Sequence, residues 1–336
     1  LSISRTQSCI SCHSPGLAFT DPRELDNVAG AVSRGADRRS LSLGDRNAQT
    51  LLYAHLAPRF GRDAQGRAIG GFFHDGRADT LEDQTGQPLL DPSEMVMGDK
   101  ASIARRIREN AAYLDALRRL FGAPAVDVDE IMYEAISKAM AEFLRGQSFA
   151  PFTSRYDRHL RGETQLTIRE SDGRELFFGR ARCATCHSSG QRDHDTFTGY
   201  RYFNVGVPSN RMVRALNGSP PGRIDRGLTQ RRTGGTDRDE GQFKVPTLRN
   251  VAVTSPYMHN GVFQELRTAI VFHLRFVSAR HSVNPETDRP WDTPEVASTV
   301  ETDSLATQGE LSDGDIDALL AFLATLTDER YEALLR

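Results

Sequence analysis

The chain has 336 residues, of which 38% are hydrophobic and 26% charged, and its formal net charge at pH 7 is −3. This length suits about two domains of ordinary size, and the composition is typical of a folded globular protein. No stretch approaches the roughly 18 apolar residues of a membrane-spanning helix, and the near-neutral charge gives no sign of a nucleic-acid-binding surface.

Helical periodicity dominates the elements predicted along the chain. Residues 102–121 and 127–144 repeat apolar side chains every three or four positions, which predicts two amphipathic helices. Thr167 opens a capping-box pattern before a third helix, and Ser312 precedes a final apolar helix. Residues 188–242 are rich in Gly, Pro, Arg and Asp and predict a long functional loop. We therefore expect a mainly α fold with long loops and little β structure.

All four cysteines lie in two copies of the pattern Cys-x-x-Cys-His. The two copies are Cys9-Ile-Ser-Cys12-His13 and Cys183-Ala-Thr-Cys186-His187. This pattern attaches haem c covalently, because the two thiols add to the haem vinyl groups and the histidine binds the iron as the proximal ligand. The sequence therefore predicts two covalent haem c groups, with His13 and His187 as their proximal ligands.

Three other interpretations of the cysteines fit less well. The two pairs lie about 170 residues apart, whereas the ligands of a zinc site usually come from one local ribbon. A thioredoxin-type redox pair needs a βαβ setting, and two structural disulfides would not need a histidine after each pair.

The repeated pattern divides the chain into two expected cytochrome c-like domains, residues 1–162 and 163–336. The boundary is expected near Arg161-Gly162-Glu163. Bacteria attach haem c outside the cytoplasm, so we expect a periplasmic protein. We interpret the start at Leu1 as a mature chain from which a signal peptide has been removed.

Further segments, in order along the chain, resemble the family of bacterial dihaem cytochrome c peroxidases and MauG. These segments are His74 to Gln84 with Pro88 and 92–94, Phe243 to Val251 with 256–261, and 311–326. Together with the two haem patterns, the resemblance covers nearly the whole chain.

In this family the N-terminal haem binds hydrogen peroxide and the C-terminal haem transfers or stores electrons. The resemblance implies that His13 serves the peroxidatic haem and that Gln84, Pro88 and Glu94 line its distal pocket. The chemistry is consistent, since a buried carboxylate with a raised pKa can take a proton from peroxide and return it to the departing oxygen. Gln84 would hold the peroxide by hydrogen bonds.

The distal positions of the two haems distinguish members of this family. Many peroxidases carry a distal histidine before the first pocket, but residues 31–46 contain none, so we expect an open first haem. At the second haem the peroxidases use methionine and MauG uses tyrosine. Here His273 falls at the matching position and is the predicted ligand, with Met258, His259 and His281 as open alternatives.

Two more positions follow from the resemblance. His74 occupies the place of a tryptophan that usually lies between the haems as an electron relay, so that relay is in doubt here. Asn47, Thr254 and Pro256 match the residues that bind a calcium ion between the two domains, and Ca²⁺ suits such oxygen donors.

We therefore expect a MauG-like enzyme that uses hydrogen peroxide to oxidise a residue, in such members a tryptophan, of a periplasmic partner protein. One alternative is a conventional peroxidase that draws electrons from a small donor cytochrome. Another is a non-catalytic electron-transfer or peroxide-sensing module. The sequence leaves open the partner, the oxidation product, the oligomeric state and the haem potentials.

Overall fold

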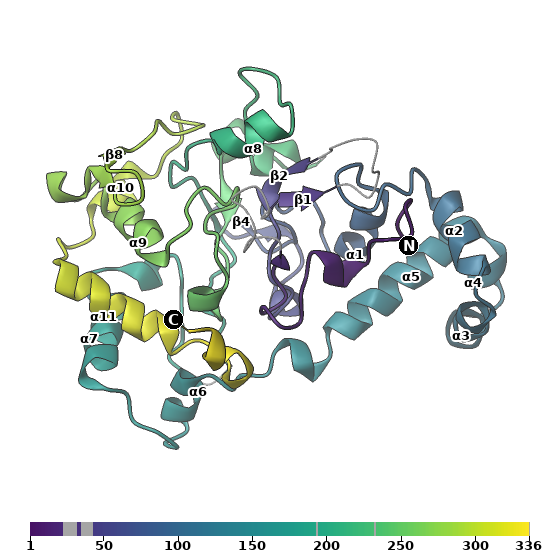
Figure 1. Ribbon diagram of the computed structural model, residues 1–336, viewed down its shortest axis with the longest axis horizontal. Coiled ribbons are helices and arrows are strands. Elements are labelled where there is room, and N and C mark those ends of the chain that lie inside the picture. Colours follow the sequence, from purple (N-terminus) through teal and green to yellow (C-terminus); the bar gives the residue numbers. More distant parts are fainter. Residues whose placement is uncertain (23–31, 35–42, 193, 232, 336) are drawn as a thin grey trace.

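The computed structural model describes residues 1–22, 32–34, 43–192, 194–231 and 233–335. The predicted mainly helical fold with little β structure is confirmed (Figure 1). The α-helices are α1 (Leu81–Leu90), α2 (Lys100–Arg108), α3 (Ala111–Phe121), α4 (Pro124–Asp127), α5 (Asp129–Leu144), α6 (Arg155–Leu160), α7 (Ile168–Phe178), α8 (Arg211–Leu216), α9 (Leu266–Leu274), α10 (Thr302–Ala306) and α11 (Asp313–Ala324).

The strands are short, and each pairs with a strand that is its neighbour in sequence. Among the described residues they form antiparallel two-stranded sheets. The pairs are β1 (Val32–Arg34) with β2 (Leu43–Asn47), β3 (Gly61–Arg62) with β4 (Ala68–Ile69), β5 (Tyr202–Phe203) with β6 (Phe243–Lys244), and β7 (Val283–Asn284) with β8 (Arg289–Pro290). Such small sheets stabilise the loops they belong to and do not form a layer of the fold.

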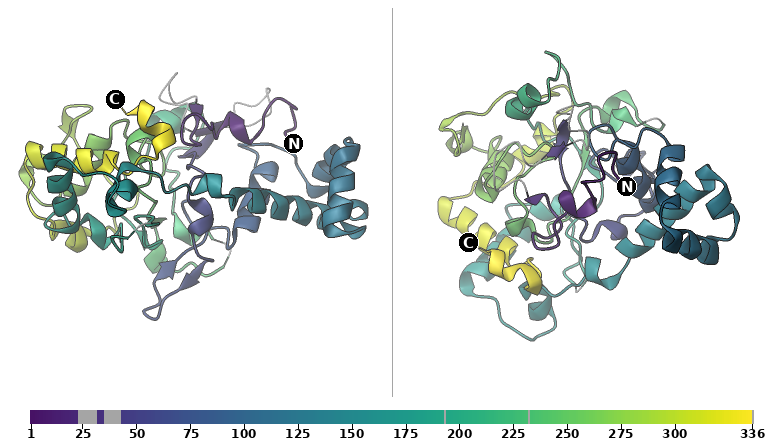
Figure 2. Two further views of the ribbon diagram at one scale, coloured as in Figure 1. Left: turned by 90° about the horizontal axis from the view of Figure 1, so that it is seen from below. Right: turned by 45° about the vertical axis from the view of Figure 1, so that its right-hand side comes forward.

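The helix predicted over residues 102–121 is in fact two helices, so that prediction was wrong in this respect. Asn110 ends the run because its backbone is extended and its side chain accepts a hydrogen bond from the N–H of Ala112, which starts α3. Hydrophobic periodicity does not reveal this break, since both helices bury apolar residues in the same cluster. The helices α2 to α4 and the first part of α5 form a lobe that projects from the rest of the molecule (Figure 2).

The predicted caps at Thr167 and Ser312 are confirmed. Each side chain accepts a hydrogen bond from the third helical N–H, in α7 and α11 respectively. These two helices lie side by side (Figure 1) and bury the largest apolar cluster of the C-terminal half. Gly173 allows this close approach, because a Cβ atom there would lie 1.9 Å from the carbonyl oxygen of Ala318.

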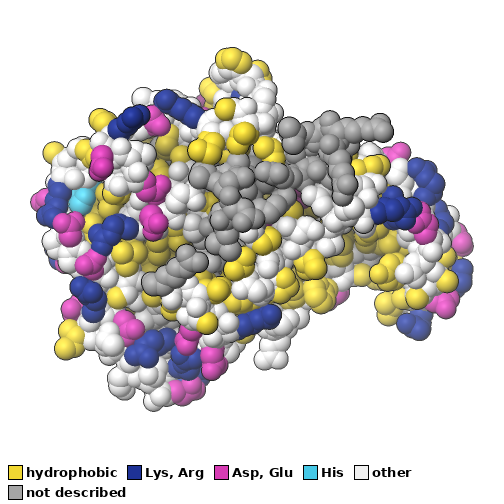
Figure 3. All heavy atoms as spheres, viewed as in Figure 1, with side chains coloured by type: hydrophobic (Ala, Val, Ile, Leu, Met, Phe, Trp, Pro, Cys, Tyr) yellow, Lys and Arg dark blue, Asp and Glu magenta, His cyan; other side chains and the backbone are white. Residues whose placement is uncertain are grey.

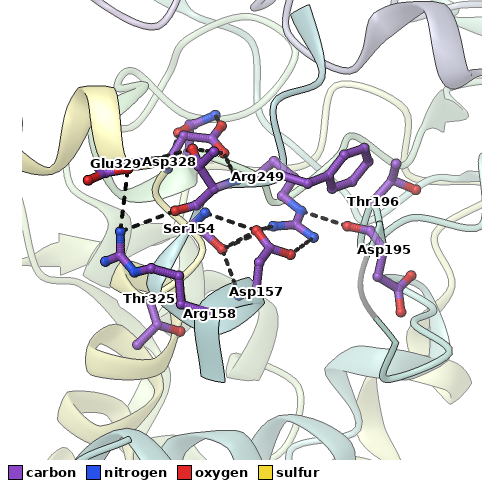
Figure 4. A network of polar contacts seen from close by, with 12 residues as sticks. Ser154, Asp157, Arg158, Asp195, Thr196, Arg249, Thr325, Asp328 and Glu329 are labelled. Atoms are coloured by element: carbon purple, nitrogen blue, oxygen red, sulfur yellow. Dashed lines mark hydrogen bonds and ion pairs between the residues drawn. The ribbon is translucent and has the colours of Figure 1, made fainter. Parts of the chain in front are cut away.

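A buried polar network joins distant parts of the chain (Figure 4). The guanidinium of Arg249 binds the carboxylate of Asp157 through two hydrogen bonds of 2.6 and 2.8 Å, and its Nε donates to the carbonyl of Asp195. The Tyr53 hydroxyl donates to Asp328 at 2.8 Å. Both members of the Arg249–Asp157 pair are fully buried, and this is tolerable because their charges are paired and hydrogen-bonded.

Basic and acidic side chains are interspersed on the face of the molecule shown in Figure 3. In the part of the chain that the structure describes, none of the helices combines the length and apolar character needed to cross a membrane.

Candidate functional site

Both Cys-x-x-Cys-His segments fold into the same short 3-10 turn. In each, the histidine N–H donates to the carbonyl of the first cysteine at 2.9 Å. The imidazole Nδ1 of His13 lies 3.1 Å from the carbonyl of Phe19, and that of His187 lies 3.3 Å from the carbonyl of Phe197. A carbonyl can only accept, so Nδ1 carries the proton in both rings and Nε2 keeps its lone pair for a metal.

The remaining features of these segments also fit haem attachment. Burial lowers the pKa of His13, and it lowers the pKa of His187 to about 4, so both rings are neutral and able to bind iron at pH 7. Within the described residues, no disulfide involves any of the four cysteines, and no cluster of three or more His, Cys, Asp or Glu side chains could hold a metal ion. The residues present therefore fit two haem c groups better than a zinc site.

The side chain of His273, on α9, lies close to that of His187. After burial, the largest influence on the low pKa of His187 is the charge of His273. The Nδ1 of His273 lies 2.7 Å from the carbonyl of Ala269, which again leaves Nε2 for a metal. Each of the two imidazoles therefore keeps the lone pair of its Nε2 available for a metal.

The three alternative residues have packing contacts of their own. His259 is stacked on the ring of Phe243, with ring centroids 3.5 Å apart. His281 is buried, and its carbonyl accepts a hydrogen bond from Trp291. Met258 packs against an apolar cluster that includes Trp291.

The predicted pocket residues of the first haem lie on α1 and the loop that follows it. Gln84 and Pro88 are four residues apart and so share one face of α1. The loop folds back on the helix, because the N–H of Met95 donates to the carbonyl of Pro88 at 3.1 Å. The N–H of Ile3 donates to the carbonyl of Met95 at 2.9 Å, which holds Glu94 beside the segment that leads to the first haem pattern.

Glu94 has the acidity that proton transfer near neutral pH requires. Its pKa is raised to about 7, mainly by burial and additionally by the charge of Asp91, whereas Arg77 opposes the shift. The Glu94 charge also contributes, after burial, to the raised pKa of the Cys9 thiol. The carboxylate thus lies within electrostatic reach of the first haem attachment pattern.

The helices α1 and α9 follow equivalent turns. Antiparallel bridges close the segments Phe72–Ala78 and Tyr257–Phe263, which lie 185 residues apart at both ends. The same spacing relates Pro88 to His273. Pro88, whose side chain cannot bind a metal, therefore occupies the position on α1 that the possible ligand His273 occupies on α9. Of residues 31–46, in which the sequence shows no histidine, 31 and 35–42 lie outside the described residues.

His74 is held between the two halves of the chain. Its Nε2 lies 3.0 Å from the carbonyl of Asn47 and its Nδ1 lies 3.2 Å from the amide nitrogen of Gln49. Burial lowers its pKa to about 4, so the ring is neutral, with the Nε2 proton donated to the carbonyl. Its ring centroid lies 6.5 Å from that of His259. Gln49 was not predicted as a site residue, because its contact with His74 arises only in the folded chain.

Two of the three predicted calcium ligands meet in the structure. The side-chain amide of Asn47 donates to the carbonyl of Pro256 at 2.7 Å, and Thr254 lies two residues earlier on the same segment. The same amide group carries an oxygen, and Ca²⁺ is bound by amide and backbone carbonyl oxygens together with water. The residues present therefore fit a calcium ion.

Known proteins resemble this chain in sequence and in fold. The sequence model of the di-haem cytochrome c peroxidases matches residues 1–165. The chain is 47% identical to the methylamine utilization protein MauG of Paracoccus denitrificans (strain Pd 1222), over 100% of this chain and 87% of that protein. It is 29% identical to the cytochrome c peroxidase Ccp of Escherichia coli (strain K12), over 82% of this chain and 50% of that protein. The crystal structure of the diheme peroxidase BthA from Burkholderia thailandensis E264 superposes with a TM-score of 0.83 at 32% identity, covering 100% of this chain and 84% of BthA.

Proposed function

We propose, from the premise that this chain belongs to the family of di-haem cytochrome c peroxidases and MauG, that it oxidises a residue of a partner protein with hydrogen peroxide. As a member of this family, the chain is an oxidoreductase that acts with hydrogen peroxide. We propose that the target is a tryptophan of the partner protein and that long-range electron transfer is the route. The 47% identity to a MauG protein supports this choice.

We further propose that residues 1–162 and 163–336 each form one haem unit. Cys9 and Cys12 would hold the first haem covalently, with His13 on its iron. The second haem would be held by the equivalent set Cys183, Cys186 and His187. Haem c supplies the capacity to accept and pass single electrons when it is bound. The repeated 3-10 turns and histidine hydrogen bonds support this arrangement.

In the first unit, the side chains around the distal position would handle protons and orient peroxide. Glu94 would take the first proton of peroxide and return it to the departing oxygen, a role for which a pKa of about 7 is suitable. Gln84 would hold the peroxide by hydrogen bonds on the face of α1 that it shares with Pro88. Pro88 carries no ligand group and would leave the distal side open.

The observation that carries the proposal is the proximity of His187 and His273. Nitrogen ligation on both sides favours the higher oxidation states of a haem, whereas methionine ligation raises its potential and suits electron uptake from a donor cytochrome. A second haem of this kind is therefore better suited to store oxidising equivalents. His74 would lie between the two units as a fixed neutral imidazole.

A conventional cytochrome c peroxidase is the second candidate. The 32% identity and the similar fold of BthA, which is named a diheme peroxidase, favour it. In that case a small redox protein would supply the electrons. For either function we propose a periplasmic location and a calcium ion bound by Asn47, Thr254 and Pro256. The name of the methylamine utilization protein MauG of Paracoccus denitrificans further supports a role in methylamine utilisation.

The two candidates are separated by adding one equivalent of hydrogen peroxide to the oxidised protein and recording optical and EPR spectra. We expect both ferric signals to be lost together, without prior reduction, and a tryptophan of the partner to gain oxygen in mass spectrometry. The matched control is His273→Met, which should still consume peroxide at the open first haem but should keep the ferric signal of the second haem, because methionine ligation disfavours higher oxidation states. If the unaltered protein reacts only after reduction, it is a donor-fed peroxidase.

A further inference from the structure

Lys244 is a partly buried cation that the proposed peroxide chemistry does not use. Its ammonium group donates to the carbonyl of Gly71 and lies 5.5 Å from the ring centroid of Phe72. Burial lowers its pKa to about 8, and the carboxylate of Asp75 opposes this shift. Lysine side chains usually extend into solvent, whereas the ammonium group of Lys244 turns inward to a backbone carbonyl at the junction of the two halves.

The contacts of Lys244 repeat those of Asn47 in the opposite direction. Each of these two residues donates two hydrogen bonds to the other half of the chain, one from its backbone N–H and one from its side chain. The two carbonyls that accept them belong to residues three positions apart. The contacts are Asn47 N to His259 O at 2.8 Å, Asn47 Nδ2 to Pro256 O at 2.7 Å, Lys244 N to His74 O at 2.8 Å, and Lys244 Nζ to Gly71 O.

The segments that carry these two residues are equivalent beyond the interface as well. Three positions after each lies a threonine whose hydroxyl donates to a carbonyl near the proximal histidine of its own half. Thr50 donates to Ala18 at 2.5 Å, and Thr247 donates to Thr196 at 2.7 Å. The acceptors directly precede the two phenylalanines whose carbonyls hold His13 and His187. An approximate twofold relation therefore exchanges Asn47 with Lys244.

We propose that the ammonium group of Lys244 is a built-in cation at the counterpart of the calcium site formed by Asn47 and Pro256. One side of the junction would then be held by Ca²⁺ and the other by the lysine. This inference rests on the calcium site of the proposed function. The chemistry of the two sides agrees with it, since a neutral amide and carbonyls attract a cation, whereas an ammonium group in the same place excludes one.

The surroundings of Lys244 also allow the roles to be exchanged. Asp75 keeps ion pairs with Arg46 at 2.6 Å and Arg77 at 3.2 Å, so removal of the lysine does not leave this carboxylate alone. An asparagine at position 244 would add an amide oxygen to the carbonyl of Gly71, with the Asp75 charge nearby. That set of groups resembles a calcium site more closely than the original Asn47 side does.

Calcium bound per chain tests the inference directly on the haem-loaded protein. After removal of free calcium, elemental analysis and calorimetric titration with Ca²⁺ should give one ion for the unaltered protein. We expect two ions for Lys244→Asn and none for Asn47→Lys. The matched control is Lys244→Met, which is similar in length to lysine but offers neither charge nor oxygen, and which should still bind one ion.

Thermal unfolding with and without EDTA gives an independent readout. Asn47→Lys should melt at the same temperature in both conditions, whereas Lys244→Asn should show a larger loss with EDTA than the unaltered protein. The inference is overturned if Lys244→Asn binds only one ion, or if Asn47→Lys still binds one. It is also overturned if the unaltered protein binds none.

If Lys244→Asn cannot be recovered folded, the melting temperature of Asn47→Lys decides the question. A lysine that replaces the ion should keep this variant as stable as the calcium-loaded unaltered protein, and a melting temperature as low as that of the unaltered protein in EDTA would overturn the inference. None of these measurements uses peroxide. The expected calcium counts could therefore hold even if no partner protein is oxidised, which separates failure of this inference from failure of the proposed enzymatic function.

Discussion

Replacement of Glu94 by glutamine should lower the rate constant of the reaction with hydrogen peroxide and remove its pH dependence. Glutamine keeps the size of the side chain but can neither accept nor return a proton. Loss of a positioned acid–base group typically slows a reaction by about 10²- to 10⁴-fold, and we expect a loss in this range. Stopped-flow spectroscopy of the oxidised protein at several peroxide concentrations measures the second-order rate constant.

The pKa of Glu94 determines the pH profile of the unaltered protein. Only the ionised carboxylate can take the first proton, so the rate constant should rise with pH and level off above a pKa of about 7. At pH 5 about 1% of the carboxyl groups are ionised, which predicts an approximately hundredfold lower rate constant than at pH 9. Glu94→Gln should show a flat profile over the same range.

The raised pKa of Glu94 should also lower the free energy of unfolding, and this loss should grow as the pH rises. An acid whose pKa rises on folding from 4.5 to about 7 destabilises the folded state once pH exceeds 4.5, and the cost reaches its full value above 7. From these values the cost is about 3 kcal/mol at pH 8 and about 1 kcal/mol at pH 5. Urea unfolding should therefore show that Glu94→Gln stabilises the protein more at pH 8 than at pH 5. An unchanged rate constant and pH profile in this variant would refute the reasoning.

Three further substitutions test other parts of the structure. His273→Ala should convert the second haem from a low-spin to a high-spin EPR signal, because one iron ligand is removed; an unchanged spectrum would show that another residue binds the iron. Asp157→Asn should lower the free energy of unfolding by about 3–5 kcal/mol in urea titrations, since it leaves the buried charge of Arg249 without its partner, and a loss below 1 kcal/mol would contradict this view. Gly173→Ala should lower the free energy of unfolding by about 1–3 kcal/mol or more in the same assay, because its Cβ atom would lie 1.9 Å from the Ala318 carbonyl oxygen. Unchanged stability would mean that α7 and α11 separate easily.

The local features of this protein could be predicted from its sequence. The two Cys-x-x-Cys-His patterns depend on neighbouring residues alone, and the caps at Thr167 and Ser312 depend on atoms three residues away. The mainly helical character also followed from the spacing of apolar residues. The break at Asn110 was missed, since an asparagine side chain that binds its own backbone does not alter the hydrophobic period.

The arrangement of groups from distant parts of the chain was decided only by the tertiary structure. Burial sets the pKa of Glu94, and burial is a property of the packed chain rather than of a carboxylate or its neighbours in sequence. The proximity of His273 to His187, and the exchange of contacts between Asn47 and Lys244, join residues that are far apart in sequence. The sequence determined which chemical groups are available, but folding determined which of them meet, because contacts between distant segments depend on the packing of the whole chain.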